Sequence, residues 1–453
     1  MQLLLGIDNS TIQLKRRIYR KMCLYEKMNK PELEIELSKL NKEYTKFQNM
    51  KLTLNMARGK PCPDQLALSA NMLDKINYIQ LAKTDTGIDT RNYGELTGIP
   101  EAKKLFASIL DVANDMIIVG GNSSLNLMYN YVDMAMQFGI LGNTPWNKLN
   151  KIKFLCPAPG YDRHFAICEL FNIEMINIKM TENGPDMNQV KQLIESDPLV
   201  KGIWCVPKYS NPSGITYSDD VVKRFASLKP AALDFRILWD NAYVIHHLSE
   251  NHDSLLNIFD ECKKFNNENM VIEFCSTSKI TFPGAGISAL AASEANIKDI
   301  TKVMSKQTIG YDKINQLRHC FFFNTTEKLK NHMAAHAKIL KPKFDLVINK
   351  LNSQIAPLNI GKWTNPNGGY FISFNSLDGC GKRIYELCKQ AGVILTNIGA
   401  TYPYGLDPNN SNIRIAPTFP NMAELKTAMD VFCLCVKIAS VEKIVSENFD
   451  KIN

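Results

Sequence analysis

Residues 274–290 read FCSTSKITFPGAGISAL and place one lysine, Lys279, among small hydroxyl and glycine residues. An apolar run precedes this segment, so we expect the lysine in a tight and partly apolar turn. Such surroundings lower the pKa of an amine, and a neutral lysine amine can attack a carbonyl to form a Schiff base. The nearby hydroxyls and backbone amides could hold a phosphate. A lysine beside a serine on a surface loop is more often only solvated, so the rest of the chain must decide.

Four short polar or aromatic segments each follow a predicted strand. They are PAPGYDRH after Cys156, PKYSNPSG after Val206, DNAY after Trp239 and STSK after Cys275. Ligands of open α/β sheets bind at the carboxyl ends of the strands. Each segment alone has a structural explanation, such as a core aromatic, a plain turn or a helix cap. Their coincidence at one edge instead predicts a pocket. Its candidate side chains are those of Tyr161, Asn211, Asp240 and Tyr243.

The segment GGNSS, residues 120–124, is a candidate anion site. It joins a short apolar strand, 116–119, to a helix predicted over 125–136. Free backbone amides at a helix N-terminus, with the hydroxyls of Ser123 and Ser124 and the amide of Asn122, suit a phosphate. Equally, Ser123 could be no more than an N-cap. The two interpretations are balanced until another part of the chain requires a phosphate.

Two further segments carry cations that could bind a carboxylate. Arg414 stands in NIRIAPTFP on a predicted strand, where an arginine can grip a carboxylate through two parallel hydrogen bonds. The segment ARGKPCP carries Arg58, Gly59 and Lys60, and its glycine and prolines predict a loop. An arginine and a lysine in such a loop are more often exposed to solvent, so both interpretations of this loop stay open.

His332 and His336 stand four residues apart on a predicted helix, a spacing that can bind zinc. No glutamate stands beside them in a HExxH pattern, so we favour a solvated helix face. No metal site is therefore predicted.

Strands and helices alternate from Lys151 onward with short connections, which is typical of an α/β fold with a largely parallel sheet. The clearest helix runs from Asp219 to Leu228 and begins after Ser218 as its cap. An amphipathic helix is expected over 31–50, and beyond residue 320 the pattern changes to a long helix, the strand-like GGYFISF and a C-terminal helix. The strand candidates are 116–119, 152–156, 173–178, 202–206, 237–239, 271–275 and 287–291.

A chain of 453 residues exceeds the usual limit for one hydrophobic core, which predicts two domains. We expect a large domain at 89–319 and a smaller α+β domain formed by 28–88, an N-terminal helix and crossing loop, together with 320–453. Residues 1–27 are an extension of unclear role. They are basic and poor in acids, so an organelle-targeting segment stays an alternative, but the leucines at 3–5 precede the basic cluster and do not fit a signal peptide.

The overall composition is that of a globular protein, with 45% hydrophobic and 22% charged residues. The net charge of +8 is mild and spread along the chain, so nucleic-acid binding is not expected. The 12 scattered cysteines include no CxxC pair, which favours a reducing compartment over a disulfide scaffold. No run of 18 apolar residues occurs, so we expect no membrane span and a cytoplasmic protein.

The motifs YGELTGIPE, GGNSS, PGYDRH, YSNPSG, WDNAY, STSK and NIRIA, in this order, resemble those of the class I pyridoxal-phosphate aminotransferases of fold type I. The resemblance extends from about residue 50 to 440. The segments ARGKP, GGNSSL and STSKITFPGAGIS are similar to a divergent aspartate aminotransferase branch related to the catalytic half of MocR-type regulators. It implies a large domain with a mostly parallel, seven-stranded-type sheet between helices, and a smaller α+β domain.

The resemblance also implies the cofactor, pyridoxal 5'-phosphate, and a role for each residue around its ring. Lys279 would form the Schiff base with the cofactor aldehyde and then carry a proton to and from the substrate α-carbon. Asp240 would keep the pyridinium nitrogen protonated. Tyr243 and Asn211 would hydrogen-bond the ring oxygen, and Tyr161 would stack on the ring.

The phosphate and the substrate have their own predicted partners in the same family comparison. Arg414 would bind the α-carboxylate of the substrate, with Gly59 and Asn211 beside it. Tyr93 resembles a tyrosine that reaches the phosphate from a neighbouring subunit, which implies a homodimer with shared active sites. The residues predicted to hold the phosphate are Asn122, Ser123, Ser124, Ser276 and Ser278.

One departure from the family pattern concerns the phosphate. Most members have an arginine a few residues after the lysine, whereas FPGAGIS places Ala285, Gly286 and Ile287 there. Helix-dipole and hydroxyl contacts, with the possible addition of a lysine from elsewhere, are expected to take over its work.

The function predicted from these residues is the transfer of an amino group from an L-amino acid, with aspartate as the leading donor, to 2-oxoglutarate by a ping-pong mechanism. An aminotransferase of other specificity and a β-eliminating lyase on the same scaffold stay open, because fold does not fix the reaction. A cofactor-sensing regulator would need a winged helix-turn-helix region, for which too few residues precede ARGKP. A second cation for a dicarboxylate substrate could be Arg58, Lys60 or Arg91.

Overall fold

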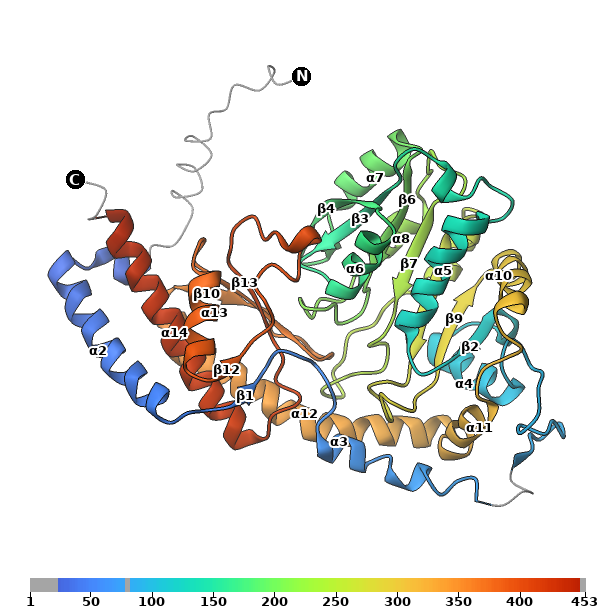
Figure 1. Cartoon of the computed structure of the whole chain (residues 1–453), viewed down its shortest axis with the longest axis horizontal. Helices are drawn as coiled ribbons and strands as arrows, with labels where there is room; N and C mark the ends of the chain where they lie inside the picture. Colours follow the sequence, from blue (N-terminus) through green and yellow to red (C-terminus); the bar gives the residue numbers. More distant parts are fainter. Residues whose placement is uncertain (1–22, 78–81, 449–453) are drawn as a thin grey trace.

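The computed structural model of the chain describes residues 23–77 and 82–448, and Figure 1 shows its arrangement. Of the extension expected at 1–27, residues 1–22 lie outside the described residues. An eight-stranded sheet with the order β2-β9-β8-β7-β6-β3-β4-β5 forms the centre of one part of the molecule. Its strands are β2 Ile117–Gly120, β3 Lys153–Ala158, β4 Glu174–Thr181, β5 Gly184–Pro185, β6 Val200–Cys205, β7 Arg236–Asp240, β8 Val271–Ser276 and β9 Ser288–Ala292.

The sheet is mostly parallel, as the sequence predicts. β8, β7, β6, β3 and β4 pair in parallel along the centre, and β9 runs antiparallel to both β2 and β8. The two-residue β5 adds an antiparallel edge to β4. All seven predicted strands are present, and the α/β fold class is confirmed.

Helices cover both faces of this sheet because successive residues of a buried strand point to opposite sides. Ile118, Leu238 and Phe274 pack with α5, α6 and α10 on one face, whereas Val119 and Ile237 belong to the core on the other face. The helices of this part are α4 Pro100–Leu110, α5 Ser124–Phe138, α6 Asp162–Leu170, α7 Met187–Ser196, α8 Asp219–Ala226, α9 Ile258–Lys263, α10 Glu294–Gln307 and α11 Lys313–Phe322.

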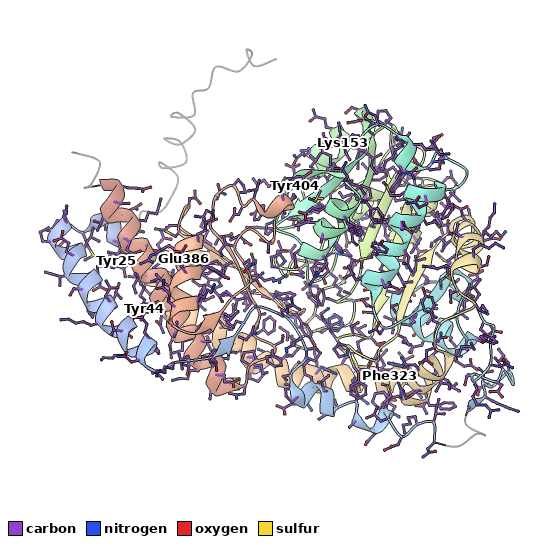
Figure 2. All side chains as sticks on the ribbon, viewed as in Figure 1. Tyr25, Tyr44, Lys153, Phe323, Glu386 and Tyr404 are labelled. Atoms are coloured by element: carbon purple, nitrogen blue, oxygen red, sulfur yellow. The ribbon has the colours of Figure 1, made fainter. Side chains whose placement is uncertain are left out.

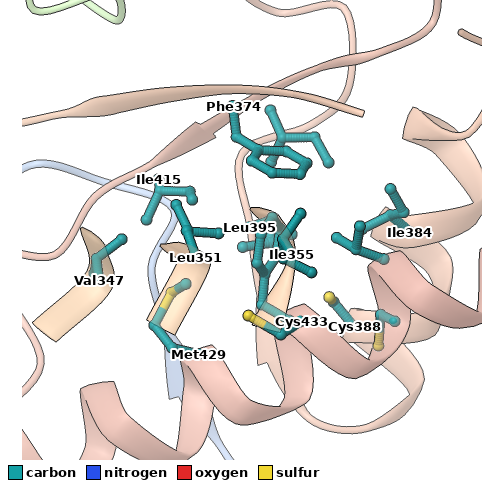
Figure 3. Close-up of a cluster of buried hydrophobic side chains, with 14 of the residues drawn as sticks. Val347, Leu351, Ile355, Phe374, Ile384, Cys388, Leu395, Ile415, Met429 and Cys433 are labelled. Carbon is teal, nitrogen blue, oxygen red and sulfur yellow. The ribbon is translucent and has the colours of Figure 1, made fainter. Parts of the chain in front are cut away.

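A second part, at the left of Figure 1, has a three-stranded antiparallel sheet of order β10-β11-β13 and its own core. Val347 and Leu351 of the long helix, Phe374, Ile415 and Met429 meet in this core (Figure 3). The limits proposed above for the two domains stay a proposal. The elements are α2 Lys30–Asn49, β1 Leu54–Asn55, α3 Pro63–Ala67, α12 Thr326–Gln354, β10 Gly361–Trp363, β11 Ile372–Ser376, α13 Gly381–Gln390, β12 Val393–Ile394, β13 Asn412–Ile415 and α14 Met422–Asn448.

Local sequence signals explain where two of the predicted helices begin. The side chain of Asn29 accepts a hydrogen bond from the Glu32 amide, and the Glu32 carboxylate accepts one from the Asn29 amide, so α2 begins with a capping box. Ser218 caps α8 by accepting from the amide of Val221, as predicted. The hydroxyl of Tyr44 then fixes α2 to the second part by donating to the Leu387 carbonyl at 2.7 Å.

The two parts touch along the loop that precedes β13. Tyr404 lies at this junction (Figure 2), and its hydroxyl accepts a hydrogen bond from the amide of Met175 in β4 at 2.8 Å. The amide of Gly160 also donates to the Thr401 carbonyl at 2.7 Å. This contact positions the loop after β3 against the second part. Among the described helices, none is both long and apolar enough to span a membrane.

Candidate active site

The candidate site lies at the carboxyl edge of the large sheet. Asp240 is the last residue of β7 and Ser276 the last of β8, while Tyr161 and Asn211 follow β3 and β6. Because these four strands are parallel, their carboxyl ends meet at one edge. Lys279 follows β8 by three residues and is brought to the same place.

The carboxylate of Asp240 is held on one side only. It is 3% exposed, and its Oδ2 lies 3.0 Å from Nε2 of His164. The His164 ring is itself fixed by stacking on Trp204, with centroids 4.3 Å apart and planes 9° from parallel. Asp240 Oδ1 is buried without a hydrogen-bond partner among the described residues. A buried carboxylate oxygen needs a donor, so this atom is suited to the N–H of a ligand.

The amine of Lys279 lies over two aromatic rings. Its Nζ is 4.9 Å from the ring centroid of Tyr243 and 5.8 Å from that of Tyr370. Burial lowers the pKa of this amine below its usual value, and the nearby negative charge of Asp240 opposes the shift. Burial therefore favours the neutral amine that a nucleophile requires.

Tyr161 and Tyr243, two buried tyrosines of this edge, keep their protons at neutral pH. Burial, with the charges of Asp240 and Asp162, raises the pKa of Tyr161 to about 12. Burial and the neighbouring Tyr161 raise the pKa of Tyr243 well above its usual value. The edge of the Tyr161 ring packs against His164, with centroids 4.9 Å apart. Both phenols are therefore available as hydrogen-bond donors.

The predicted phosphate residues are brought together from two segments. Ser278 Oγ donates to the Asn122 carbonyl at 2.9 Å, and Ser276 Oγ donates to Ser278 Oγ at 3.0 Å. Ser123 stands at the N-cap position of α5, but its side chain makes no capping hydrogen bond. The Ser123 hydroxyl therefore makes no hydrogen bond to the helix. The start of α5 and the turn that carries Ser276 and Ser278 lie against each other at the predicted phosphate site.

Arg414 lies on β13, 6% exposed, and faces the edge of the large sheet. Its Nη1 donates to Asp162 Oδ1 at 3.1 Å and to Asn211 Oδ1 at 3.3 Å. Nη2 donates to Thr396 Oγ1 at 3.2 Å, and the guanidinium lies 4.8 Å from the ring centroid of Phe371. A guanidinium held on several sides in this way keeps a fixed orientation, which bidentate carboxylate binding requires.

Gly59 lies against the same phenylalanine. A Cβ at this position would stand 2.5 Å from Phe371 Cζ, so the backbone of residue 59 can lie this close to the Phe371 ring only because the residue is glycine. The neighbouring Arg58 and Lys60 are exposed, as the structural interpretation of this loop expects. Lys60 Nζ lies 3.9 Å from the ring centroid of Phe419.

Two residues of the loop before α4 lie outside these contacts. Tyr93 is 82% exposed in the single chain. Arg91 forms an exposed ion pair with Asp89 in its own loop. Neither residue contacts the Asp240 and Lys279 cluster through a hydrogen bond or ion pair found in the described chain.

His164 was not identified from the sequence, and the structure places it beside Asp240. His164 stands in the PGYDRH motif, three residues after Tyr161 and in the first turn of α6. That position beside a predicted site residue was the signal that could have identified it. The expectation of a solvated face for His332 and His336 is wrong for His336, which is 2% exposed. Nε2 of His332 lies 2.7 Å from the Ile280 carbonyl and Nε2 of His336 lies 3.0 Å from it, because α12 packs beneath the Lys279 turn.

The chain is similar to known proteins in sequence and in fold. A family described as "Aspartate amino-transferase" matches residues 28–448. An aspartate aminotransferase of Corynebacterium glutamicum is 40% identical over 404 residues, covering 89% of this chain and 93% of the relative. The crystal structure of an aspartate transaminase from that organism superposes with a TM-score of 0.90 at 38% identity, covering 93% and 99% of the two chains. The α-aminoadipate aminotransferase LysN of Thermus thermophilus, solved with N-(5'-phosphopyridoxyl)-L-leucine, shares the fold at 14% identity and a TM-score of 0.69, covering 90% and 96%.

Proposed function

This chain belongs to the aspartate aminotransferase family and is an aminotransferase, and we propose that aspartate is its amino donor and 2-oxoglutarate its acceptor. The amino group would move in two half-reactions, as in a ping-pong mechanism. The donor assignment is supported by the 40% identical relative named as an aspartate aminotransferase. The site geometry supports the chemistry common to the family.

The residues present fit pyridoxal 5'-phosphate. When bound, this cofactor supplies an electrophilic aldehyde and a ring that takes up the electrons released at the substrate α-carbon. The single observation that best supports a cofactor in this site is that Asp240 Oδ1 has no hydrogen-bond partner among the described residues. His164 contacts the other oxygen, Oδ2, and so fixes the direction of the carboxylate. An anionic oxygen there would keep a ring nitrogen protonated.

Lys279, Tyr243 and Asn211 would act on the reacting side of the ring. The buried amine of Lys279 would take a proton from the substrate α-carbon and return it, since burial lowers its pKa and so favours the neutral base. The protonated phenol of Tyr243 would donate a hydrogen bond to a ring oxygen. Asn211 would donate through its amide nitrogen, since its Oδ1 already accepts from Arg414. Tyr161 would cover the ring face.

The phosphate would be held without the usual arginine. The amides at the start of α5 offer donors from one side. The hydroxyls of Ser276 and Ser278, which donate to Ser278 and to the Asn122 carbonyl in the single chain, would turn toward the phosphate from the other side. The segment that replaces the arginine is clamped by Asn315, whose side-chain amide donates to the carbonyls of Ala285 and Gly286 at 3.1 Å and 2.8 Å. Arg318 in turn donates to Asn315 and brings a cation to this segment.

Arg414 would bind the α-carboxylate of the substrate. Asp162 and Asn211 occupy its Nη1 at 3.1 Å and 3.3 Å. A carboxylate that binds here would therefore share the guanidinium with Asp162, which keeps the arginine oriented before the substrate arrives. Gly59 would allow the substrate to lie close to the crossing loop.

A homodimer with shared sites is part of this proposal. Tyr93 would complete the phosphate site of a second copy of the chain, and its 82% exposure in the single chain leaves it available for that contact. The oligomeric state of the purified protein tests the homodimer. The affinity of a Tyr93→Phe variant for pyridoxal phosphate tests the role of the tyrosine.

Purified protein incubated with aspartate and 2-oxoglutarate tests the donor directly. We expect oxaloacetate and glutamate in equal amounts. Activity with other amino acids but none with aspartate would contradict the donor and leave the family assignment intact. Release of ammonia and a 2-oxo acid from a substrate that carries a β-leaving group would instead favour the eliminating lyase.

A further inference from the structure

A buried hydrogen-bond network lies directly beneath the turn that carries Lys279. It contains Gln65 of α3, His332 and His336 of α12, and Tyr370, which precedes β11. Gln65 is fully buried, and His336 and Tyr370 are 2% and 1% exposed. None of these residues has a role in the function proposed above, and three separate parts of the chain supply them.

The donors and acceptors of this network form one consistent set. Gln65 Oε1 accepts from the Cys62 amide at 3.1 Å, which leaves Gln65 Nε2 as a donor to His336 Nδ1 at 3.0 Å and to Tyr370 Oη at 2.8 Å. Because His336 Nδ1 accepts, its proton is on Nε2, which lies 3.0 Å from the Ile280 carbonyl. His332 Nε2 lies 2.7 Å from the same carbonyl and 3.1 Å from His336 Nε2, so the two histidines meet at one acceptor.

Both ends of the network finish on the backbone of the lysine turn. Tyr370 Oη donates to the carbonyl of Lys279 at 3.3 Å. His336 and His332 converge on the next carbonyl, that of Ile280, and the His332 contact is 2.7 Å. Two successive carbonyls are thus held from below, while the Lys279 side chain extends over the rings of Tyr243 and Tyr370.

The network also joins the lysine to the substrate side of the site. Gln65 lies a few residues after Ala57, whose carbonyl accepts from Arg414 Nη2 at 3.5 Å. Thr418, close to Arg414 in sequence, donates to the Lys60 carbonyl at 3.1 Å. The crossing segment is therefore fixed at one end by the carboxylate-binding region and at the other by His336 and Tyr370, which support the Lys279 turn.

We propose that Gln65 and His336 are positioning residues, which hold the Lys279 turn so that the amine stays buried over Tyr243 and Tyr370. This inference rests on the proposed function only in naming Lys279 as the reacting amine. Without the network, the two carbonyls would lose their donors and the turn would relax toward solvent. The amine would then become easier to protonate.

The test measures the amine itself in the full chain freed of cofactor. Lys279 is labelled with acetic anhydride across a range of pH, and mass spectrometry of its peptide gives the midpoint of reactivity. We expect Gln65→Leu and His336→Leu to raise this midpoint by about one pH unit, and so to slow labelling at pH 7.5 several-fold. His336→Gln keeps a donor at the place of Nε2 and should restore most of the wild-type midpoint.

Gln316→Leu is the matched control, because Gln316 is also fully buried and accepts one hydrogen bond, from the Ile99 amide at 2.9 Å. It should lower the melting temperature without moving the midpoint of Lys279. If a leucine variant does not fold, Tyr370→Phe removes the one hydroxyl that donates to the Lys279 carbonyl and accepts from Gln65, and it should move the midpoint the same way. Unchanged midpoints in all the folded network variants would overturn the proposal.

A separate measurement keeps this outcome distinct from the proposed function. Wild-type protein is mixed with pyridoxal phosphate and reduced with borohydride, and the Lys279 peptide is weighed. Absence of the adduct would contradict the role of Lys279 in the proposed function. The labelling midpoints would still report whether Gln65 and His336 position the turn.

Discussion

Nε2 of His164 lies 3.0 Å from Oδ2 of Asp240, and the other oxygen of this buried carboxylate has no partner among the described residues. The histidine is fixed by stacking on Trp204. One oxygen is therefore used to orient the carboxylate, and the other is left for the ligand. Such a division of work is common where a carboxylate must meet a ligand in one direction.

Asp240→Asn is expected to lower transamination about 100-fold or more, because the neutral amide cannot keep the cofactor ring nitrogen protonated. The variant has nearly the same shape, so folding should be preserved. The measurement is kcat with aspartate, beside the affinity for pyridoxal phosphate. A variant with wild-type kcat would contradict the role proposed for the free oxygen.

Lys279→Ala should abolish the visible absorbance of the bound cofactor and lower activity about 1,000-fold or more. Circular dichroism and the melting temperature check that the fold is intact. Lys343→Ala is a suitable control, since Lys343 is also buried but donates to the Thr418 carbonyl instead. An unchanged spectrum in Lys279→Ala would show that another group holds the cofactor.

Arg414→Gln should raise the KM for the amino donor about 100-fold, because a neutral side chain loses two charge-assisted hydrogen bonds to the carboxylate. Cofactor affinity should change little. Steady-state kinetics with aspartate and a spectroscopic titration with pyridoxal phosphate separate the two effects. If cofactor affinity fell and KM did not, the arginine would serve the cofactor site instead.

Ser278→Ala should weaken pyridoxal phosphate more than pyridoxal, which lacks the phosphate. The expected loss is about tenfold, the size of one hydrogen bond to a charged group. Ser305→Ala, at an exposed serine on α10, is the control. Equal losses for both ligands would mean that Ser278 supports the turn and not the phosphate.

The histidines under the Lys279 turn should make stability depend on pH. Burial lowers the pKa of His336 to about 4 and also lowers that of His332. Between pH 6.5 and 4 the unfolded chain binds more protons than the folded one at these residues, so the free energy of unfolding falls as the pH falls through this window. The lowered pKa of His336 corresponds to a decrease of roughly 3 kcal/mol in the free energy of unfolding across this window.

His336→Gln should remove this part of the pH dependence and leave the rest. The measurement is urea unfolding of both proteins at pH 7 and pH 4.5. The variant should lose less stability than the wild type between the two values. Parallel curves would show that His336 is not a buried neutral histidine in solution.

The sequence alone determined the order of the elements and the residues at the ends of the strands. Short apolar runs and short connections predict the parallel strands, and the residues at the end of each strand or just after it place Asp240, Asn211 and Lys279 at one edge. All seven predicted strands are present in the structure. This part was accessible because strand patterns and turn residues are local in the chain.

The tertiary structure alone decided which distant side chains support that edge. Gln65 meets His336 across 271 positions of the chain, and Arg414 meets Asn211 across 203. A helical spacing of four residues shows that His332 and His336 share a face, but not whether solvent or the Lys279 turn lies against it. That choice depends on how α12 packs on the sheet, and no local pattern records it.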